Sequence, residues 1–323
     1  MCTERPQVSL QPAGVRVPSA LAATGWGLLA CCLWCTSIAV TRRVTEDVGV
    51  LRGGMLVLGL AGLLGVLRAC LQGRLRQALS GLSRAYLLGC GACFVAYQFC
   101  LLLAIGLAVD GLQVVVVGVI NYLWPALTLA VSVPLLQRRW SGWLVLGLLL
   151  TVAGEVLVVG SRLFGGTKAA SALDLHSLLC FGLAAVAAIC WALYSNLARR
   201  LAGVATGDAV PLFLSVTSLS LLPLVLLFPE PVHWTAQTPW AVAFMAVCPG
   251  LLAYTWWDRG MRFGHAKLLT VISYLIPLGS TAATSLVLRV WPEWSIWIGA
   301  GMVLGGAFVC HYSVSDEASV ELQ

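Results

Sequence analysis

The sequence predicts an all-α integral membrane protein with ten transmembrane helices, arranged as two inverted five-helix repeats. Of its 323 residues, 60% are hydrophobic and only 10% are charged, whereas about 25% of a soluble domain is charged. Ten apolar stretches approach the length of about 20 residues that spans a bilayer. The two halves of the chain also carry similar markers in the same order. Together these observations predict the fold class.

The expected spans are apolar runs separated by short connections, most of which contain Gly, Pro or charged residues. They cover residues 22–41, 50–71, 86–108, 112–135, 143–161, 177–198, 209–228, 240–261, 267–288 and 295–313. The first run is expected to be a spanning helix and not a removable signal peptide. The expected division is a disordered cytoplasmic tail (1–20), a first repeat (21–161), a loop (162–175), a second repeat (176–313) and a cytoplasmic tail (314–323).

The repeat is indicated by residues that recur at a fixed offset. Trp34 and Trp191 lie 157 positions apart, and each is followed at the same distance by an Arg pair. Tyr97 and Tyr254, each preceded by Ala, have the same offset. Chance similarity between apolar segments is common, but several markers in the same order favour a duplicated half.

Two proline phrases, residues 119–125 and 271–277, share a pattern of a small polar residue, Tyr, Leu, an apolar residue and Pro. Because proline breaks the backbone hydrogen-bond ladder, each phrase is expected to interrupt a spanning helix. Paired interruptions in two halves point to the binding site of a transporter. We therefore expect Pro125 and Pro277 to act in gating as hinges, with a static kink as the alternative.

The distribution of Lys and Arg predicts the orientation. With the N-terminus inside, the cytoplasmic loops and tail hold thirteen of these residues and the opposite side holds six. Both termini are therefore expected in the cytoplasm. Five spans per half is an odd number, so the second half enters the membrane inverted.

Most tryptophans lie at span ends, where they fit interfacial anchors. Trp34, Trp124 and Trp191 lie well inside their helices. In span four, Asn121, Trp124 and Thr128 fall on one helix face. Polar groups in hydrocarbon need partners, so this face is expected to point inward. The alternative is that small polar residues serve helix packing alone.

An inward cavity lined by Tyr97, Tyr122, Trp124 and Trp191 suits a planar apolar or aromatic substrate. Ring contacts contribute about 0.5–1.5 kcal/mol each beyond burial, and an ammonium over an indole face adds roughly 0.5–2 kcal/mol. Gln98 and Asn121 are expected to hydrogen-bond the carboxylate or ammonium of the substrate. The expected substrate-binding residues are Tyr97, Gln98, Asn121, Tyr122, Trp124, Trp191, Tyr194, Ser273 and Tyr274.

Two acidic residues are candidates for energetic coupling, since charges at membrane depth are costly and tend to be functional. Glu155 lies inside span five and could bind a proton for antiport. Asp258 lies near the cytoplasmic end of span eight, where a salt bridge or a helix-end contact is the alternative.

The sequence resembles the drug/metabolite transporter superfamily in its EamA branch. The resemblance rests on the ten spans in two halves, on residues 121–125 (NYLWP), and on Tyr254 to Arg259 with the second proline phrase. Within the branch it is most similar to the YddG-type bacterial aromatic amino-acid exporters, through residues 96–101 (AYQFCL) and Trp191. The resemblance implies a secondary transporter of the bacterial inner membrane that exports aromatic and other neutral amino acids by alternating access. The alternative is an exporter of other small metabolites or of cationic drugs such as planar dications.

Other classes of function lack their motifs. The four histidines lie at span ends, and neither H-E-x-x-H nor G-x-S-x-G occurs, so an intramembrane enzyme is not expected. The chain has no G-x-x-x-x-G-K-[ST], so ATP is not the expected energy source. Its basic residues form no cluster that would bind nucleic acid. Most cysteines fall in apolar runs without zinc spacing, so we expect no disulfide, metal or other cofactor.

Overall fold

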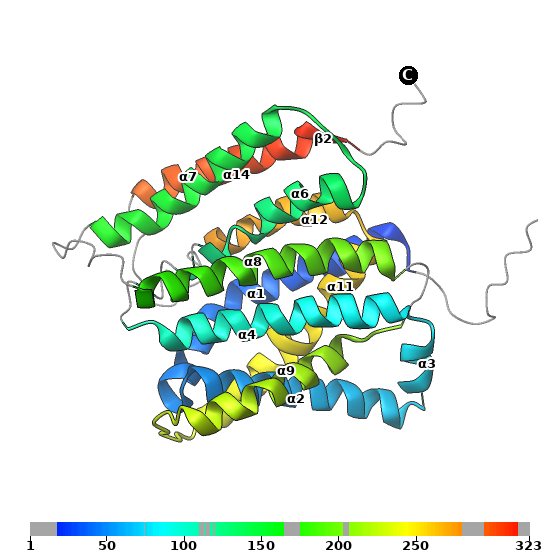
Figure 1. Ribbon diagram of the computed structural model, residues 1–323, viewed down its shortest axis with the longest axis vertical. Coiled ribbons are helices and arrows are strands. Elements are labelled where there is room, and N and C mark those ends of the chain that lie inside the picture. Colours follow the sequence, from blue (N-terminus) through cyan, green and yellow to red (C-terminus); the bar gives the residue numbers. More distant parts are fainter. Residues whose placement is uncertain are drawn as a thin grey trace, which may run out of the picture.

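The computed structural model describes residues 18–73, 75–109, 113, 117, 118, 120–164, 175–202, 207–279 and 294–315, and these are almost entirely helical (Figure 1). In the first half the helices are α1 (Ala20–Val48), α2 (Val50–Leu71), α3 (Leu75–Ser80), the π-helical η1 (Tyr86–Cys90) continuing into α4 (Gly91–Leu107), α6 (Trp124–Leu135) and α7 (Trp143–Phe164). In the second half they are α8 (Leu175–Leu201), α9 (Val210–Leu227), α10 (Thr238–Met245) continuing through the π-helical η2 (Ala246–Leu252) into α11 (Ala253–Phe263), α12 (Ala266–Ser273) and α14 (Trp294–Ser313).

Six of these helices are long and apolar enough to cross a membrane, which makes the chain an all-α, multi-pass membrane protein. They cover Ala20–Ser37, Val50–Leu71, Tyr86–Leu107, Leu175–Leu201, Val210–Leu227 and Thr238–Phe263. Shorter apolar helices occur at Trp124–Leu135, Trp143–Gly154 and Ala266–Gly279. Six tryptophans near helix ends are more than half exposed, as interfacial anchors would be: Trp140, Trp143, Trp234, Trp240, Trp294 and Trp297.

Both proline phrases interrupt a helix at the same relative position. A turn at Tyr122 and Leu123 precedes α6, and Tyr274 forms a turn after α12. In each case the turn begins three residues before the proline, which has no N–H for the carbonyl four residues earlier. The expected breaks at Pro125 and Pro277 are therefore present in the backbone. The expected end of span nine, residues 280–288, lies outside the described residues.

The helices near the centre pack as two groups, each of which contains elements from both halves. Bundle A consists of α1, the continuous helix α10–η2–α11, and α12. Bundle B consists of η1–α4, α6 and α8. At the two edges α7 packs on α14, and α2 packs on α9 (Figure 1). Exchanging each helix for its counterpart in the other half converts bundle A into bundle B, which is the relation expected of a duplicated fold.

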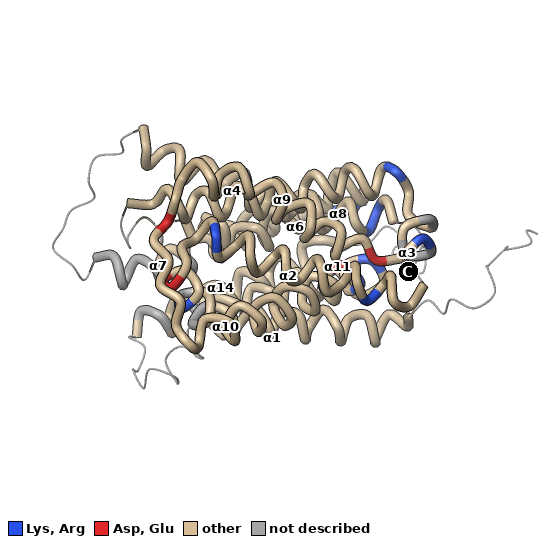
Figure 2. Tube along the Cα trace, turned by 90° about the horizontal axis from the view of Figure 1, so that it is seen from below, with Lys and Arg blue, Asp and Glu red and all other residues tan. Residues whose placement is uncertain are grey.

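The two ends of the molecule differ in charge. The end that we call the closed end holds the start of α1, η1, and the last turns of α8 and α11. The antiparallel strands β1 (Arg139–Trp140) and β2 (Val314–Ser315) also pair there. Figure 2 shows that most of the coloured Lys and Arg positions gather at this end, around α3 and α11.

At the opposite, open end, α1 turns into α2 at Gly49, which has a φ of +86°. The carboxylate of Glu230 accepts hydrogen bonds from the backbone N–H groups of Val50, Leu51 and Arg52 at 2.7–3.1 Å. It thus caps a helix N-terminus 180 residues away in the chain. A Cβ at Gly49 would lie 2.4 Å from the Glu230 carboxyl carbon, so this close approach requires glycine.

Candidate substrate cavity

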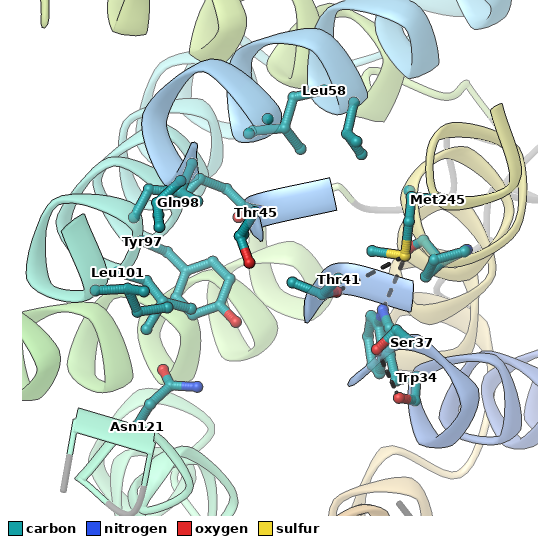
Figure 3. Close-up of a pocket in the computed structure, with 18 of the residues that line it drawn as sticks. Trp34, Ser37, Thr41, Thr45, Leu58, Tyr97, Gln98, Leu101, Asn121 and Met245 are labelled. Carbon is teal, nitrogen blue, oxygen red and sulfur yellow. Dashed lines mark hydrogen bonds between the residues drawn. The ribbon is translucent and has the colours of Figure 1, made fainter. Parts of the chain in front are cut away.

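A cavity of about 350 Å³ lies between bundle A and bundle B. It extends from the buried tryptophans near the middle of the helices to Thr45 and Val50 at the open end. Bundle A contributes Trp34, Ser37 and Thr41, which face Tyr97, Gln98 and Leu101 of α4 across the space (Figure 3). This volume falls in the range of small-molecule sites, which is about 300–1,000 Å³.

The structure brings together most of the residues that the sequence indicated. The cavity-lining set includes Tyr97, Gln98, Asn121, Tyr122, Trp124 and Trp191. They come from α4, from the interrupted segment before α6, from the start of α6 and from α8, all in the first-half interruption or bundle B. Figure 3 shows Asn121 below Tyr97, both directed toward the open space.

Three expected residues lie elsewhere. Tyr194 is fully buried, and its hydroxyl is directed to Asp258 on the closed side. Ser273 donates to the carbonyl of Thr270 at 2.6 Å, within its own helix. Tyr274 is buried in a separate apolar cluster between α6, α7 and α14. From the second proline phrase, Ile276 reaches the cavity.

Four indole rings form a floor between the cavity and the closed end, and we call Trp34, Trp124, Trp191 and Trp257 the tryptophan floor. Trp34 lies edge-on to Trp191 at a centroid distance of 5.9 Å and tilted against Trp257 at 5.5 Å. Trp124 meets Trp257 at 5.3 Å and Trp191 at 6.1 Å. Edge-to-face and tilted rings at these distances are favourable. Because the four residues come from α1, α6, α8 and α11, the floor joins both bundles.

The residues that marked the sequence repeat meet in this floor. Trp34 packs on Tyr254 at 5.5 Å, and its repeat mate Trp191 packs on Tyr97 at 4.7 Å. The indole N–H of Trp34 donates to the carbonyl of Pro249 at 3.3 Å, which fixes the ring. Pro249 lies within η2, a π-helical segment of the kind often found at functional sites.

Trp34, Tyr254 and Pro249 were not among the expected site residues, although all three line the cavity. Two of them carried a usable signal, since Trp34 and Tyr254 are the repeat mates of Trp191 and Tyr97. The third, Pro249, carried only a weak signal, namely a proline in the sequence Cys-Pro-Gly inside an apolar run.

The polar groups of the cavity are uncharged. Its described lining contains hydroxyls of Ser, Thr and Tyr with the amides of Gln98 and Asn121, and no Asp, Glu, Lys or Arg. Gln98 is 5% exposed. The Nε2 atom of Gln98 and the Oδ1 atom of Asn121 are buried and have no hydrogen-bond partner among the described residues. An unsatisfied buried donor and acceptor are expensive, so a bound molecule with a polar head could pair with them.

Of the two acidic candidates, Asp258 lies apart from the described cavity lining. Asp258 makes a buried salt bridge with Arg262, one helical turn away, at 3.0 Å. The neighbouring Arg259 pairs instead with Asp208, at 3.7 Å. Glu155 lies in α7, but its side chain is outside the described part of the structure.

Two carboxylates outside the spanning segments have shifted pKa values. A hydrogen bond from the hydroxyl of Thr238 lowers the pKa of Asp47, and the hydroxyl of Thr235 and the guanidinium of Arg43 act in the same direction. Burial raises the pKa of Asp208, while the nearby Arg259 opposes that shift. Asp47 ties the end of α1 to the start of α10, so it belongs to the open end.

The fold is that of a multi-pass membrane protein with an aromatic, uncharged cavity between two helix bundles, and the named relatives of this chain are transporters. This chain is similar to a transporter family, to two curated exporters and to a solved crystal structure. A sequence model of the EamA-like transporter family matches residues 178–311. The aromatic amino acid exporter YddG of Escherichia coli K12 is 32% identical over 292 residues, which is 89% of this chain and 96% of that protein.

A second aromatic amino acid exporter YddG, from Salmonella typhimurium, is 31% identical over 291 residues, covering 89% of this chain and 96% of the relative. A solved crystal structure superposes with a TM-score of 0.73 at 29% identity, over 90% of this chain and 96% of its own. The chain belongs to the EamA-like transporter family of the drug/metabolite transporter superfamily, in a group with these exporters.

Proposed function

We propose that this protein is a secondary transporter that exports aromatic and other neutral amino acids across the bacterial inner membrane by alternating access. The observation that carries the proposal is the cavity, which offers aromatic rings and uncharged hydrogen-bonding groups between two bundles. The family relationship supports it, because similar proteins along most of the chain are named aromatic amino acid exporters.

The proposed topology is ten spans in two inverted halves, with residues 21–161 and 176–313 as the repeats and both termini in the cytoplasm. The exchange relation between bundle A and bundle B supports the inversion. The excess of Lys and Arg at the closed end favours that end as the cytoplasmic one. The structure then corresponds to an outward-open state. A C-terminal reporter found on the outer face of the membrane would contradict this orientation.

Both the ring and the charged groups of a zwitterionic aromatic amino acid would find complementary side chains in the cavity. Its ring would pack against the tryptophan floor, and Tyr97 and Tyr122 would enclose it. Its carboxylate and ammonium groups would pair with the donor of Gln98 and the acceptor of Asn121. A site without a charged clamp holds its substrate weakly, which an exporter needs in order to release it.

Alternating access would move one bundle against the other around this site. Pro125 and Pro277 would serve as hinges, because each leaves a carbonyl one turn earlier without its helical partner. Three of the expected residues would then not contact the substrate in this conformation. They would instead stabilise the packing of the helices that move: Tyr194, Ser273 and Tyr274. Proton coupling through Glu155 stays a separate proposal, and pH-dependent transport that persists in Glu155→Gln would reject it.

Proteoliposomes test the proposal most directly. Vesicles preloaded with unlabelled phenylalanine should accumulate labelled phenylalanine by exchange, and labelled threonine more slowly. A planar dication should not exchange, because the described lining has no carboxylate to offset its charge. Uptake of the dication without uptake of phenylalanine would replace the proposed function with the cationic-drug alternative.

A further inference from the structure

The closed end contains a buried polar cluster that the cavity does not use. Oδ1 of Asp258 accepts hydrogen bonds from the hydroxyl of Tyr86 at 2.8 Å and from the hydroxyl of Tyr194 at 2.9 Å. Oδ2 of Asp258 contacts Nη1 of Arg262 at 3.0 Å. Both tyrosines are fully buried, and each side chain of the ion pair is 1% exposed.

The cluster joins the two bundles. Asp258 and Arg262 belong to α11 in bundle A, whereas Tyr86 of η1 and Tyr194 of α8 belong to bundle B. Nearby bonds do the same: the indole of Trp257 donates to Ser195 at 3.2 Å, and Arg199 donates to the carbonyl of Gly264 at 2.9 Å. Separation of the bundles at this end therefore has to break these contacts.

The charges and the hydroxyls of the cluster would behave differently in that movement. Asp258 and Arg262 lie at positions i and i+4 of one helix, so they can stay paired when bundle B moves away. Arg262 also donates to the carbonyl of Gly207 at 2.8 Å. The carboxylate keeps its counter-ion, and the contacts that must break at Asp258 are the two tyrosine hydroxyls.

The tryptophan floor links this cluster to the cavity. On α8, Trp191 and Tyr194 are one turn apart, with ring centroids separated by 5.1 Å. On α11, Trp257 directly precedes Asp258. A substrate ring that packs against Trp191 and displaces it would therefore also shift Tyr194 and its hydroxyl.

We propose that Tyr86, Tyr194 and Asp258 form a latch that holds the closed end shut, and that an aromatic substrate on Trp191 loosens it. The second clause rests on the proposed function. The repeat explains why the latch is one-sided. At the offset of 157, Tyr194 and Asp258 correspond to Ser37 and Leu101, which both line the cavity. The open end, when it closes, would therefore have no carboxylate at the equivalent place to hold it shut. For this reason the conformation described here, with the closed end shut, would be favoured in the absence of substrate.

Hydrogen–deuterium exchange on the full chain in lipid nanodiscs, without substrate, tests the latch. The double variant Tyr86→Phe/Tyr194→Phe removes two hydroxyls and leaves the ion pair intact. Each hydroxyl bond to a charged group should change the opening equilibrium by about tenfold. We expect faster exchange in η1 and in the last turns of α8 and α11, and unchanged exchange at the α1–α2 turn.

The matched control is Tyr312→Phe, since Tyr312 is 72% exposed on α14 and belongs to neither bundle. It should exchange like the unmodified protein. If the double variant also exchanges like the unmodified protein, or if exchange rises equally at both ends, the latch is refuted. Either result concerns the latch alone, because no transport is measured.

The link to substrate is tested by adding phenylalanine to the unmodified protein. Exchange in η1 and the end of α11 should rise several-fold at saturating phenylalanine, and the increase should be smaller in Trp191→Leu. A preparation that transports phenylalanine but shows no such rise would overturn the link. Failure of transport itself would instead count against the proposed function.

Discussion

The closed end and the open end of this protein are stabilised by different kinds of contact. At the closed end, buried side chains on two separate bundles bond to one another around Asp258. At the open end, the bonds of Asp47 and Glu230 tie α1 and α2 to the segment that leads into α10, while the cavity separates the bundles. In the proposed transport cycle the first arrangement would control how the bundles move, and the second would keep the outer segments in place during that movement.

The largest effect is expected where the two ends meet, at the tryptophan floor. Trp124→Ala should reduce export of phenylalanine to background, because it removes ring contacts with the substrate, Trp191 and Trp257. Efflux of labelled phenylalanine from cells measures this. Trp124→Phe, which retains a ring, should keep part of the activity. Full export by the Ala variant, at an equal amount in the membrane, would contradict the site.

At the closed end, Arg262→Met should lower the free energy of unfolding by about 3–5 kcal/mol, because it leaves the buried carboxylate of Asp258 without a counter-ion. Unfolding by denaturing detergent, followed by tryptophan fluorescence, measures the loss. The double variant Asp258→Asn/Arg262→Met removes both charges and should recover part of the stability. If the double variant is no more stable than the single one, the charge argument fails.

At the open end, Glu230→Ala should cost only about 1–2 kcal/mol, since it removes a helix cap. The same unfolding measurement applies, and Glu230→Gln, which retains one carbonyl acceptor, should lie between the two. A loss as large as that of Arg262→Met would remove the contrast between the ends.

Inside the cavity, Gln98→Met keeps the volume of the side chain but deletes the amide. We expect the KM for phenylalanine export to rise about fivefold, the value of roughly one hydrogen bond. Initial rates in proteoliposomes measure KM, and Leu103→Met, on the same helix but outside the described cavity lining, is the control. An unchanged KM would show that Gln98 does not contact the substrate.

The smallest effect concerns pH. Because the pKa of Asp47 is lowered in the folded state, its contribution to stability is present above the ordinary carboxyl pKa of about 3.9 and is lost as the pH falls through its lower folded value. Asp47→Asn should therefore lower the thermal midpoint near neutral pH, and the difference from the unmodified protein should shrink as the pH falls below about 4, the ordinary carboxyl pKa, and vanish only below the lowered folded pKa. A difference that is constant down to pH 3 would contradict this.

The sequence was sufficient to predict the class of fold and much of the candidate site. Long apolar segments belong in a bilayer, where the backbone has to satisfy its own hydrogen bonds, so the helical character of the chain follows from the sequence. Proline has no N–H to donate to the carbonyl one turn earlier, so the breaks at residues 122 and 274 follow from the local sequence as well. Aromatic residues well inside apolar runs need an interior place, which explains why Trp124 and Trp191 lie in the cavity. The offset of 157 linked Trp34 and Tyr254 to their mates before any contact was known.

Tertiary structure decided which of these residues share a site. Tyr194 and Trp191 lie on one helix face, yet Trp191 lines the cavity and Tyr194 bonds to Asp258. Helical periodicity gives the face of a residue but not the position along the axis at which a neighbouring helix crosses it. Helical spacing accounts for the pairing of Asp258 with Arg262 at i and i+4. Packing alone decides that Asp258 also bonds Tyr194 of another helix, and that Glu230 caps a helix 180 residues away. The local sequence thus determined where the helices form and where they break. The packing of helices that are distant in the sequence determined which side chains line the cavity and which bond to one another at the closed end.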